Sequence, residues 1–199
     1  MGRCQGVGMQ IIDISQAYPG CCVYPGDRAP ELTRRSAITR DVPSYNISDI
    51  SMCLHNGTHI DAPFHTDSHG LSAADLPLSV FFGRAAVVLA AGDIGSAEAR
   101  HLTAKAKTSR LLLKGKCRVT AAGAREFVKS KIILLGAEGV SISSGDEEYD
   151  AHCALLGAGI SVLEGLDLRH AEPDIYLLSA FPLKITDADA APCRAVLIR

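Results

Sequence analysis

Residues 55–65 read His-Asn-Gly-Thr-His-Ile-Asp-Ala-Pro-Phe-His and hold three of the seven histidines of the chain together with one aspartate. Imidazole nitrogens and carboxylate oxygens are ligands that suit zinc and manganese. Four such groups this close in sequence can converge on one ion without a large arrangement of the fold. The segment therefore predicts a metal site, and its candidate residues are His55, His59, Asp61 and His65.

The local sequence opposes a helix here, although His55 and His59 have the spacing of helical zinc sites. Gly57, the β-branched residues and the proline all disfavour helical geometry. Side chains alternate along an extended chain, so we expect His59 and Asp61 to point to the same side. The Ala-Pro pair then turns the chain so that His65 returns toward the ion. The alternatives are a histidine-rich surface loop or scattered core histidines, and neither gives a reason for the glycine and proline at the bends.

This run resembles the signature of the cyclase family of metal-dependent hydrolases, which includes bacterial kynurenine formamidases and isatin hydrolases. The family pattern is His-x-Gly-Thr-His-x-Asp-x-Pro-x-His, and residues 55–65 meet every fixed position. The resemblance implies an α/β fold in which a single-domain mixed sheet carries flanking helices, of the swivelling β/β/α type. It extends along most of the chain.

Two further candidates lie far from this segment. A helix predicted over 147–156 carries His152 on an inward face with Tyr149, and by its residues alone His152 is best explained as a core histidine. Glu164 continues an apolar face of a strand predicted over 159–164, as either a strand-end surface residue or a buried ligand. Members of the cyclase family carry a histidine on a helix and a glutamate twelve residues later, and His152 and Glu164 have that spacing.

Residues 24–27, Tyr-Pro-Gly-Asp, form a turn by their Pro-Gly pair. The turn resembles the aromatic-Pro-Gly-Asp turn of the family, whose aromatic residue in kynurenine formamidases is a tryptophan that contacts substrate. Tyr24 is therefore the candidate for substrate binding. Leu-Lys-Gly-Lys at 113–116 stands where family members usually have an Arg-Thr-Gly-Trp-like segment. Both differences bear on the identity of the substrate.

The resemblance also implies a metal content and an activity. One or two zinc ions would bind per subunit, with manganese as the alternative metal. The implied ligands of the first ion are His55, His59 and Asp61, and those of the second are Asp61, His152 and Glu164. His65 resembles the proton donor and acceptor of the family. The implied enzyme is an arylformamidase of tryptophan catabolism that hydrolyses a small-molecule amide, N-formylkynurenine, to kynurenine and formate, and it would be a homodimer or homotetramer.

Two other functions stay open. An isatin hydrolase-like enzyme that opens a cyclic amide would share every metal ligand, and a non-catalytic metal-binding protein would use the same side chains for structure. Closed structural zinc sites normally use four protein ligands, so six candidate residues without a cysteine favour catalysis. The sequence holds no Gly-x-Ser-x-Gly elbow, phosphate loop or dinucleotide fingerprint.

Apolar strands alternate with helices along the rest of the chain, which predicts an α/β core with some parallel pairing. We expect residues 10–199 to form one domain and residues 1–9 to be a loose tail. A half-buried strand is expected from residue 50, with His55 at its end. The other predicted strands cover 10–15, 84–91, 111–113, 132–136 and 175–181, and the other predicted helices cover 96–107 and 120–129.

The composition excludes some classes of partner. A net charge of −2 over 199 residues gives no electrostatic basis for binding nucleic acid or an anionic membrane. The seven cysteines form no Cys-x-x-Cys pair, and the sequence shows no secretory apolar segment and no membrane-length apolar stretch. We therefore expect a reducing, cytoplasmic environment.

Overall fold

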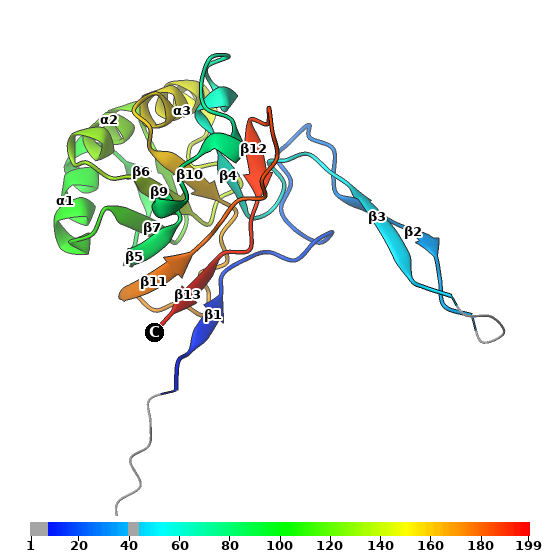
Figure 1. Cartoon of the computed structure of the whole chain (residues 1–199). Coiled ribbons are helices and arrows are strands. Elements are labelled where there is room, and N and C mark those ends of the chain that lie inside the picture. Colours follow the sequence, from blue (N-terminus) through cyan, green and yellow to red (C-terminus); the bar gives the residue numbers. More distant parts are fainter. Residues whose placement is uncertain (1–7, 40–43) are drawn as a thin grey trace, which may run out of the picture.

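Nine strands form one mixed sheet in the part of the chain that the computed structural model describes, residues 8–39 and 44–199. Positions 1–7 of the predicted tail lie outside the described residues. The spatial order of the strands is β1 (Ile11–Asp13), β13 (Val196–Ile198), β11 (Ile175–Ser179), β5 (Phe82–Leu89), β7 (Arg110–Lys114), β9 (Leu134–Ala137), β10 (Ser161–Glu164), β4 (His59–Asp61) and β12 (Ala190–Pro192). Segments far apart in sequence, β4 and β12, therefore lie side by side at one edge (Figure 1).

The four middle strands, β5, β7, β9 and β10, run parallel to one another, whereas β11 and β4 pair antiparallel with them. Parallel neighbours need crossover connections, which helices supply here. These helices lie together over one face of the sheet (Figure 1) and are α1 (Ser96–Ala106), α2 (Ala121–Lys129) and α3 (Glu148–Gly157). The predicted α/β fold is thus confirmed.

The core forms on both faces of the sheet because side chains alternate along each strand. On β7, Leu111 and Leu113 pack in the helix-side cluster with Phe127 of α2. Leu112, between them, packs in the cluster on the opposite face with Ile60 of β4. Strand β4, which carries two of the predicted ligands, is therefore anchored by burial of its central residue.

Several smaller elements complete the described structure. Strands β6 (Gly92–Ile94) and β8 (Cys117–Val119) form a separate parallel pair that was not predicted from the sequence. Short 3-10 helices occur at η1 (Pro63–His65), η2 (Ala73–Asp75), η3 (Leu78–Val80) and η4 (Gly145–Glu147). Among the described helices, none has the length and apolar character needed to cross a membrane.

A hairpin projects from the body of the molecule (Figure 1). It consists of β2 (Glu31–Ser36) and β3 (Ile47–Ser51), which pair antiparallel. The half-buried strand predicted to run from residue 50 into His55 is wrong, because β3 ends at Ser51 and all of its residues are exposed. Alternation of apolar residues predicts a buried face only where another element covers that face. His55 instead lies within a turn that comes after the hairpin.

Candidate metal centre

Strand β4 carries two of the predicted ligands, His59 and Asp61. It pairs antiparallel with β10 and β12, and all three of its residues are buried. His59 and Asp61 lie on one face of the strand, while Ile60 between them points into the core. Nε2 of His59 is 3.3 Å from Oδ1 of Asp61. The predicted extended geometry of this segment is therefore confirmed.

The two distant candidates, His152 and Glu164, meet at the same place. His152 lies on α3 and Glu164 at the end of β10, and both are buried. Nε2 of His152 is 3.3 Å from Oε1 of Glu164, which also accepts a hydrogen bond of 2.6 Å from the N–H of Ile142. The sequence left open whether Glu164 is a surface residue at the end of its strand or a buried group, and the structure shows that it is buried. Tyr149, predicted on the inward face with His152, is instead 69% exposed.

A tight turn brings His55 to the same centre. Gly57 has φ of +61°, and a Cβ there would lie 2.8 Å from Cβ of Cys21, so the turn needs glycine. Thr58 fixes the turn, because its hydroxyl donates to the carbonyl of Gly165 at 2.6 Å and accepts from the N–H of Gln16 at 2.8 Å. As a result Nδ1 of His55 approaches the carboxylate of Asp61.

Three imidazoles face Asp61 with one nitrogen each, and each uses its other nitrogen for an outward hydrogen bond. His59 donates from Nδ1 to the carbonyl of Gly57 at 3.0 Å, and His152 from Nδ1 to the carbonyl of Glu148 at 2.8 Å. His55 donates from Nε2 to a carboxylate at 2.8 Å. Metal-binding histidines usually donate their second ring N–H in this way, which fixes the ligand nitrogen toward the ion.

Polar atoms without partners mark where an ion would fit. Nε2 of His59 and both carboxylate oxygens of Asp61 are buried and have no hydrogen-bond partner among the described residues. Unpartnered buried polar atoms are costly, and a cation with nitrogen and oxygen ligands would satisfy all three. The residues thus fit a metal ion. Two groups of candidate ligands each have their ligand atoms within 4.8 Å of one another. The first group is His55, His59 and Asp61, and the second is Asp61, His152 and Glu164.

The neighbouring carboxylates also raise the proton affinity of the imidazoles at this centre. Burial alone would lower the pKa of His55, but its contacts with Asp189 and Asp61 raise that pKa to about 9. Burial likewise opposes the charged form of His152, and Glu164 raises its pKa to about 9. Burial would raise the pKa of Asp61, yet the adjacent imidazoles hold it well below its usual range. The centre therefore attracts positive charge, which protons or a metal ion can supply.

His65 lies beside the centre and not within it. The predicted turn is confirmed: Ala62 precedes η1, and the N–H of His65 donates to the carbonyl of Ala62 at 2.9 Å. The ring centroid of His65 is 4.4 Å from that of His55 and 5.9 Å from that of His152. Its side chain is 35% exposed. His65 is thus available to a molecule that approaches the buried residues.

A cavity of about 550 Å³ opens onto the centre. It is of the size that binds small molecules. Among the predicted site residues, its lining includes Tyr24, His55, Asp61, His65, His152 and Glu164. Tyr24 is partly exposed at this cavity, and its hydroxyl donates to Oε2 of Glu148 at 2.9 Å. The structure therefore brings the candidate for substrate binding to the same cavity as the candidate ligands.

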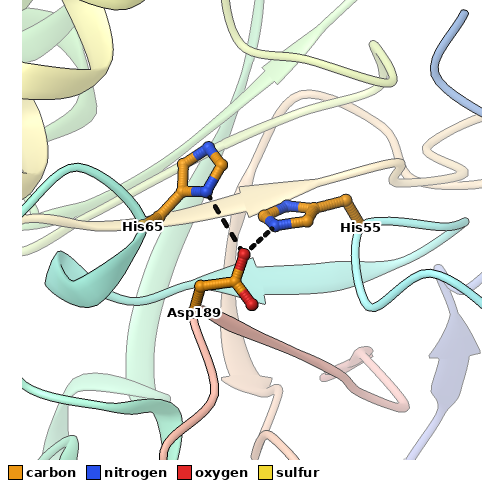
Figure 2. Close-up of side chains that lie close together, drawn as sticks. All are labelled: His55, His65 and Asp189. Atoms are coloured by element: carbon orange, nitrogen blue, oxygen red, sulfur yellow. Dashed lines mark hydrogen bonds and ion pairs between the residues drawn. The ribbon is translucent and has the colours of Figure 1, made fainter. Parts of the chain in front are cut away.

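Asp189 belongs to this site although it carries no sequence signal of its own. It precedes β12, and its Oδ2 accepts the hydrogen bond from Nε2 of His55. Oδ2 also lies 3.5 Å from Nδ1 of His65 (Figure 2). Asp189 is far from His55 in the sequence, and another aspartate, Asp187, lies two residues before it. Nothing in the sequence indicates which of the two aspartates contacts the histidine.

The fold and this centre define an α/β protein with a candidate metal site at the edge of a curled mixed sheet. The family model described as putative cyclase matches residues 12–116. Kynurenine formamidase of Salinibacter ruber (strain DSM 13855 / M31) is 34% identical over 206 residues, which cover 95% of this chain and 97% of that protein. Kynurenine formamidase of Bacillus mycoides (strain KBAB4) is 34% identical over 94% of this chain and 97% of its own length. The chain therefore belongs to the cyclase family.

Solved structures agree with this assignment. A structure described as a potential metal-dependent hydrolase with cyclase activity superimposes with a TM-score of 0.81 at 27% identity, covering 96% of this chain and 98% of that one. Isatin hydrolase A from Labrenzia aggregata, bound to benzyl benzoate, has a TM-score of 0.81 at 21% identity, covering 96% of this chain and 93% of its own. The second likeness shows the shared fold.

Proposed function

We propose that this protein is a metal-dependent amide hydrolase, an arylformamidase that hydrolyses N-formylkynurenine to kynurenine and formate. The observation that carries the proposal is the carboxylate of Asp61, which is buried at the cavity without hydrogen-bond partners among the described residues and is faced by three imidazole nitrogens. The relatives named kynurenine formamidase, which align along nearly the whole chain, support this choice of substrate.

The metal would be held by the residues that surround Asp61. His55 and His59 complete a first group with it, and His152 and Glu164 complete a second. We propose zinc, in one or two sites, with manganese as the alternative, because nitrogen and oxygen donors suit both. When bound there, a divalent cation supplies Lewis acidity, which activates water near neutral pH and polarises a carbonyl group.

His65 is the residue that we propose moves the proton that amide hydrolysis requires. The oxygen of water adds to the formyl carbon, the bond from that carbon to nitrogen breaks, and the departing amine must gain a proton. Figure 2 shows one ring nitrogen of His65 directed to Asp189 and the other pointing away from it. The second nitrogen is the proposed proton donor to the amine. An aniline-type leaving group is weakly basic, which eases this step.

Tyr24 is the proposed contact for the aromatic part of the substrate. The hydrogen bond of its hydroxyl to Glu148 fixes the ring at the edge of the cavity. An aromatic ring held in this way offers a flat apolar face for stacking. The family tryptophan is replaced by tyrosine, which offers a smaller aromatic face. Recognition of the aryl group of the substrate should therefore differ from that in relatives with tryptophan.

The decisive experiment measures hydrolysis of N-formylkynurenine by protein that has been stripped with a chelator and then reloaded separately with zinc and with manganese. Release of kynurenine, restored by one or both metals, supports the proposal and identifies the metal. Failure with both metals, in protein shown to contain them, would contradict the arylformamidase assignment. Isatin is then the next substrate to assay, because a cyclic amide would use the same ligands.

We also propose a cytoplasmic homo-oligomer, either a homodimer or a homotetramer. The projecting hairpin supports this assembly, because an isolated two-stranded hairpin is only marginally stable in water. Leu32 and Ile50 on the hairpin are 54% and 52% exposed, which leaves apolar surface for a second copy to cover. Light scattering of the purified protein tests the assembly, and a monomer would contradict it.

A further inference from the structure

Asp189 is rigidly placed beside the ligand strand. Its backbone carbonyl accepts the N–H of Ala62 at 2.9 Å, and the next residue, Ala190, pairs with Asp61 in the register of β12 and β4. On its other side, the carbonyl of Ala188 accepts the N–H of Ala73 at 2.9 Å. The position of the Asp189 side chain is thus set by the same sheet edge that carries the candidate ligands.

One carboxylate oxygen of Asp189 lies between two imidazoles that have different proposed roles. Oδ2 is 2.8 Å from Nε2 of His55 and 3.5 Å from Nδ1 of His65 (Figure 2). The first distance is that of a strong hydrogen bond with a charged acceptor. The second is at the limit of direct hydrogen bonding. A single oxygen therefore lies within contact distance of both rings.

The contact determines which nitrogen of His55 can bind an ion. With Nε2–H donated to Asp189, Nδ1 is the nitrogen left to bind an ion, and it lies 3.0 Å from Oδ1 of Asp61. His59 and His152 donate their outward N–H groups to backbone carbonyls, which no substitution removes. Among the acceptors of these three outward N–H groups, Asp189 is the one that uses its side chain. Its contribution can therefore be tested by substitution.

We propose that Asp189 is a positioning residue that holds His55 in its metal-binding orientation and His65 in its proton-transferring orientation. The part that concerns His65 rests on the proposed function, whereas the part that concerns His55 depends only on metal binding. Carboxylates that accept from a ligand histidine typically strengthen it as a ligand. Asp189 thereby couples the residue that binds the ion to the residue that transfers the proton.

The test compares Asp189→Asn and Asp189→Ala with the matched control Asp187→Asn, which changes an exposed aspartate two positions away. Zinc affinity is measured by competition with a chromogenic chelator. We expect both Asp189 variants to bind zinc about 10- to 100-fold more weakly with unchanged stoichiometry, as for other carboxylate partners of ligand histidines. The control should keep the wild-type affinity. Equal affinity in all proteins would overturn the proposal.

Imidazole NMR supplies a readout that general loss of structure would not imitate. Long-range ¹H–¹⁵N spectra of the zinc-loaded protein should show His55 protonated at Nε2, with this proton protected from exchange with solvent by its bond to Asp189. Asp189→Ala should lose this protection while His59 keeps its own. Unchanged protection of the His55 proton would contradict the proposal. Loss of one zinc ion per chain in the variants would also overturn it, because Asp189 would then be a ligand together with His55 and His65.

Kinetics separate this inference from the proposed function. If the protein hydrolyses N-formylkynurenine, the variants assayed at saturating zinc should lose kcat with little change in KM, because His65 is misplaced. A wild-type kcat in both variants would remove the role toward His65. If the wild-type protein does not hydrolyse this substrate but the variants still bind zinc more weakly, the proposed function fails and the role of Asp189 toward His55 stands.

Discussion

Glu164 and His59 are register partners on the adjacent strands β10 and β4, and Oε2 of Glu164 lies 3.3 Å from Nε2 of His59. Two residues that are distant in sequence are therefore joined by sheet pairing, which is more rigid than a pair of loops. Because Asp61 lies two residues further along β4, the same pairing sets its place between the two groups of candidate ligands.

Asp61→Ala should remove metal and activity together, because Asp61 is shared by both groups of candidate ligands. We expect the metal content, measured by elemental analysis, to fall to background and hydrolysis to become undetectable. Asp187→Asn serves as the control and should keep both properties. Retention of one full equivalent of metal by the Asp61 variant would contradict its proposed place in both groups of ligands.

His65→Ala should separate catalysis from metal binding. The His65 side chain lies beside the centre and is accessible from the cavity, so its removal should leave the metal content unchanged. Loss of a general acid and base typically costs about 10²- to 10⁴-fold in rate, and we expect kcat to fall in that range. His69→Ala, at an exposed position on the same loop, is the matched control. Equal turnover in the two variants would remove the role of His65.

The stability of the metal-free protein should fall as the pH rises above neutrality. The contacts with carboxylates raise the pKa of His55 and of His152 from 6.5 to about 9 in the folded state. Each group therefore contributes stability that is fully present below pH 6.5 and is lost as the pH rises through about 9. Urea unfolding of chelator-treated protein across this window tests the prediction. A flat or rising profile would contradict it.

Metal binding should show the opposite dependence on pH. An ion at the centre must displace protons from the imidazoles, so binding releases protons and becomes stronger as the pH rises. Calorimetric titration with zinc in buffers of different ionisation enthalpy measures the number of protons released. We expect net release near neutral pH in the wild-type protein. Binding without proton release would show that the imidazoles are already neutral in the metal-free state.

The extended ligand segment could be predicted from sequence because its determinants are local. Alternation alone places His59 and Asp61 on one face, and the Ala-Pro pair before His65 accounts for the turn. The helices predicted over 96–107, 120–129 and 147–156 correspond to α1, α2 and α3 to within one residue at each end. The order of the strands in the sheet depends on the crossover connections. The alternation of strands and helices along the sequence indicates these connections only in outline.

Features that depend on distant contacts could not be predicted in this way. Apolar alternation near residue 50 is the same whether or not another element covers the strand, so the exposure of β3 was not foreseeable. Asp189 acts through sheet pairing that brings β12 beside β4, and its own neighbours in sequence give no sign of this. The role of Glu164 was open for the same reason, because burial at a strand end is a tertiary property.

Tyr24→Ala should weaken substrate binding more than it affects the chemical step. The tyrosine ring lies at the cavity, and its hydroxyl bonds to Glu148, which is not one of the candidate ligands. We expect an increased KM for N-formylkynurenine with a modest change in kcat, and an unchanged metal content. Tyr24→Phe keeps the aromatic face and removes only the hydrogen bond to Glu148, so its KM should lie closer to wild type. Equal KM values for Tyr24→Ala and wild type would remove Tyr24 from the substrate site.

Gly57→Ala should destabilise the protein and weaken metal binding, whereas Gly92→Ala should only destabilise it. Both glycines have positive φ, +61° and +67°, so alanine at either costs about 1–2 kcal/mol of backbone strain. A Cβ at position 92 meets open space, but one at position 57 would lie 2.8 Å from Cβ of Cys21. Relief of that clash must move the turn that presents His55. Urea unfolding and zinc titration of both variants measure the two effects. Equal zinc affinity in the two variants would show that the turn does not set the position of His55.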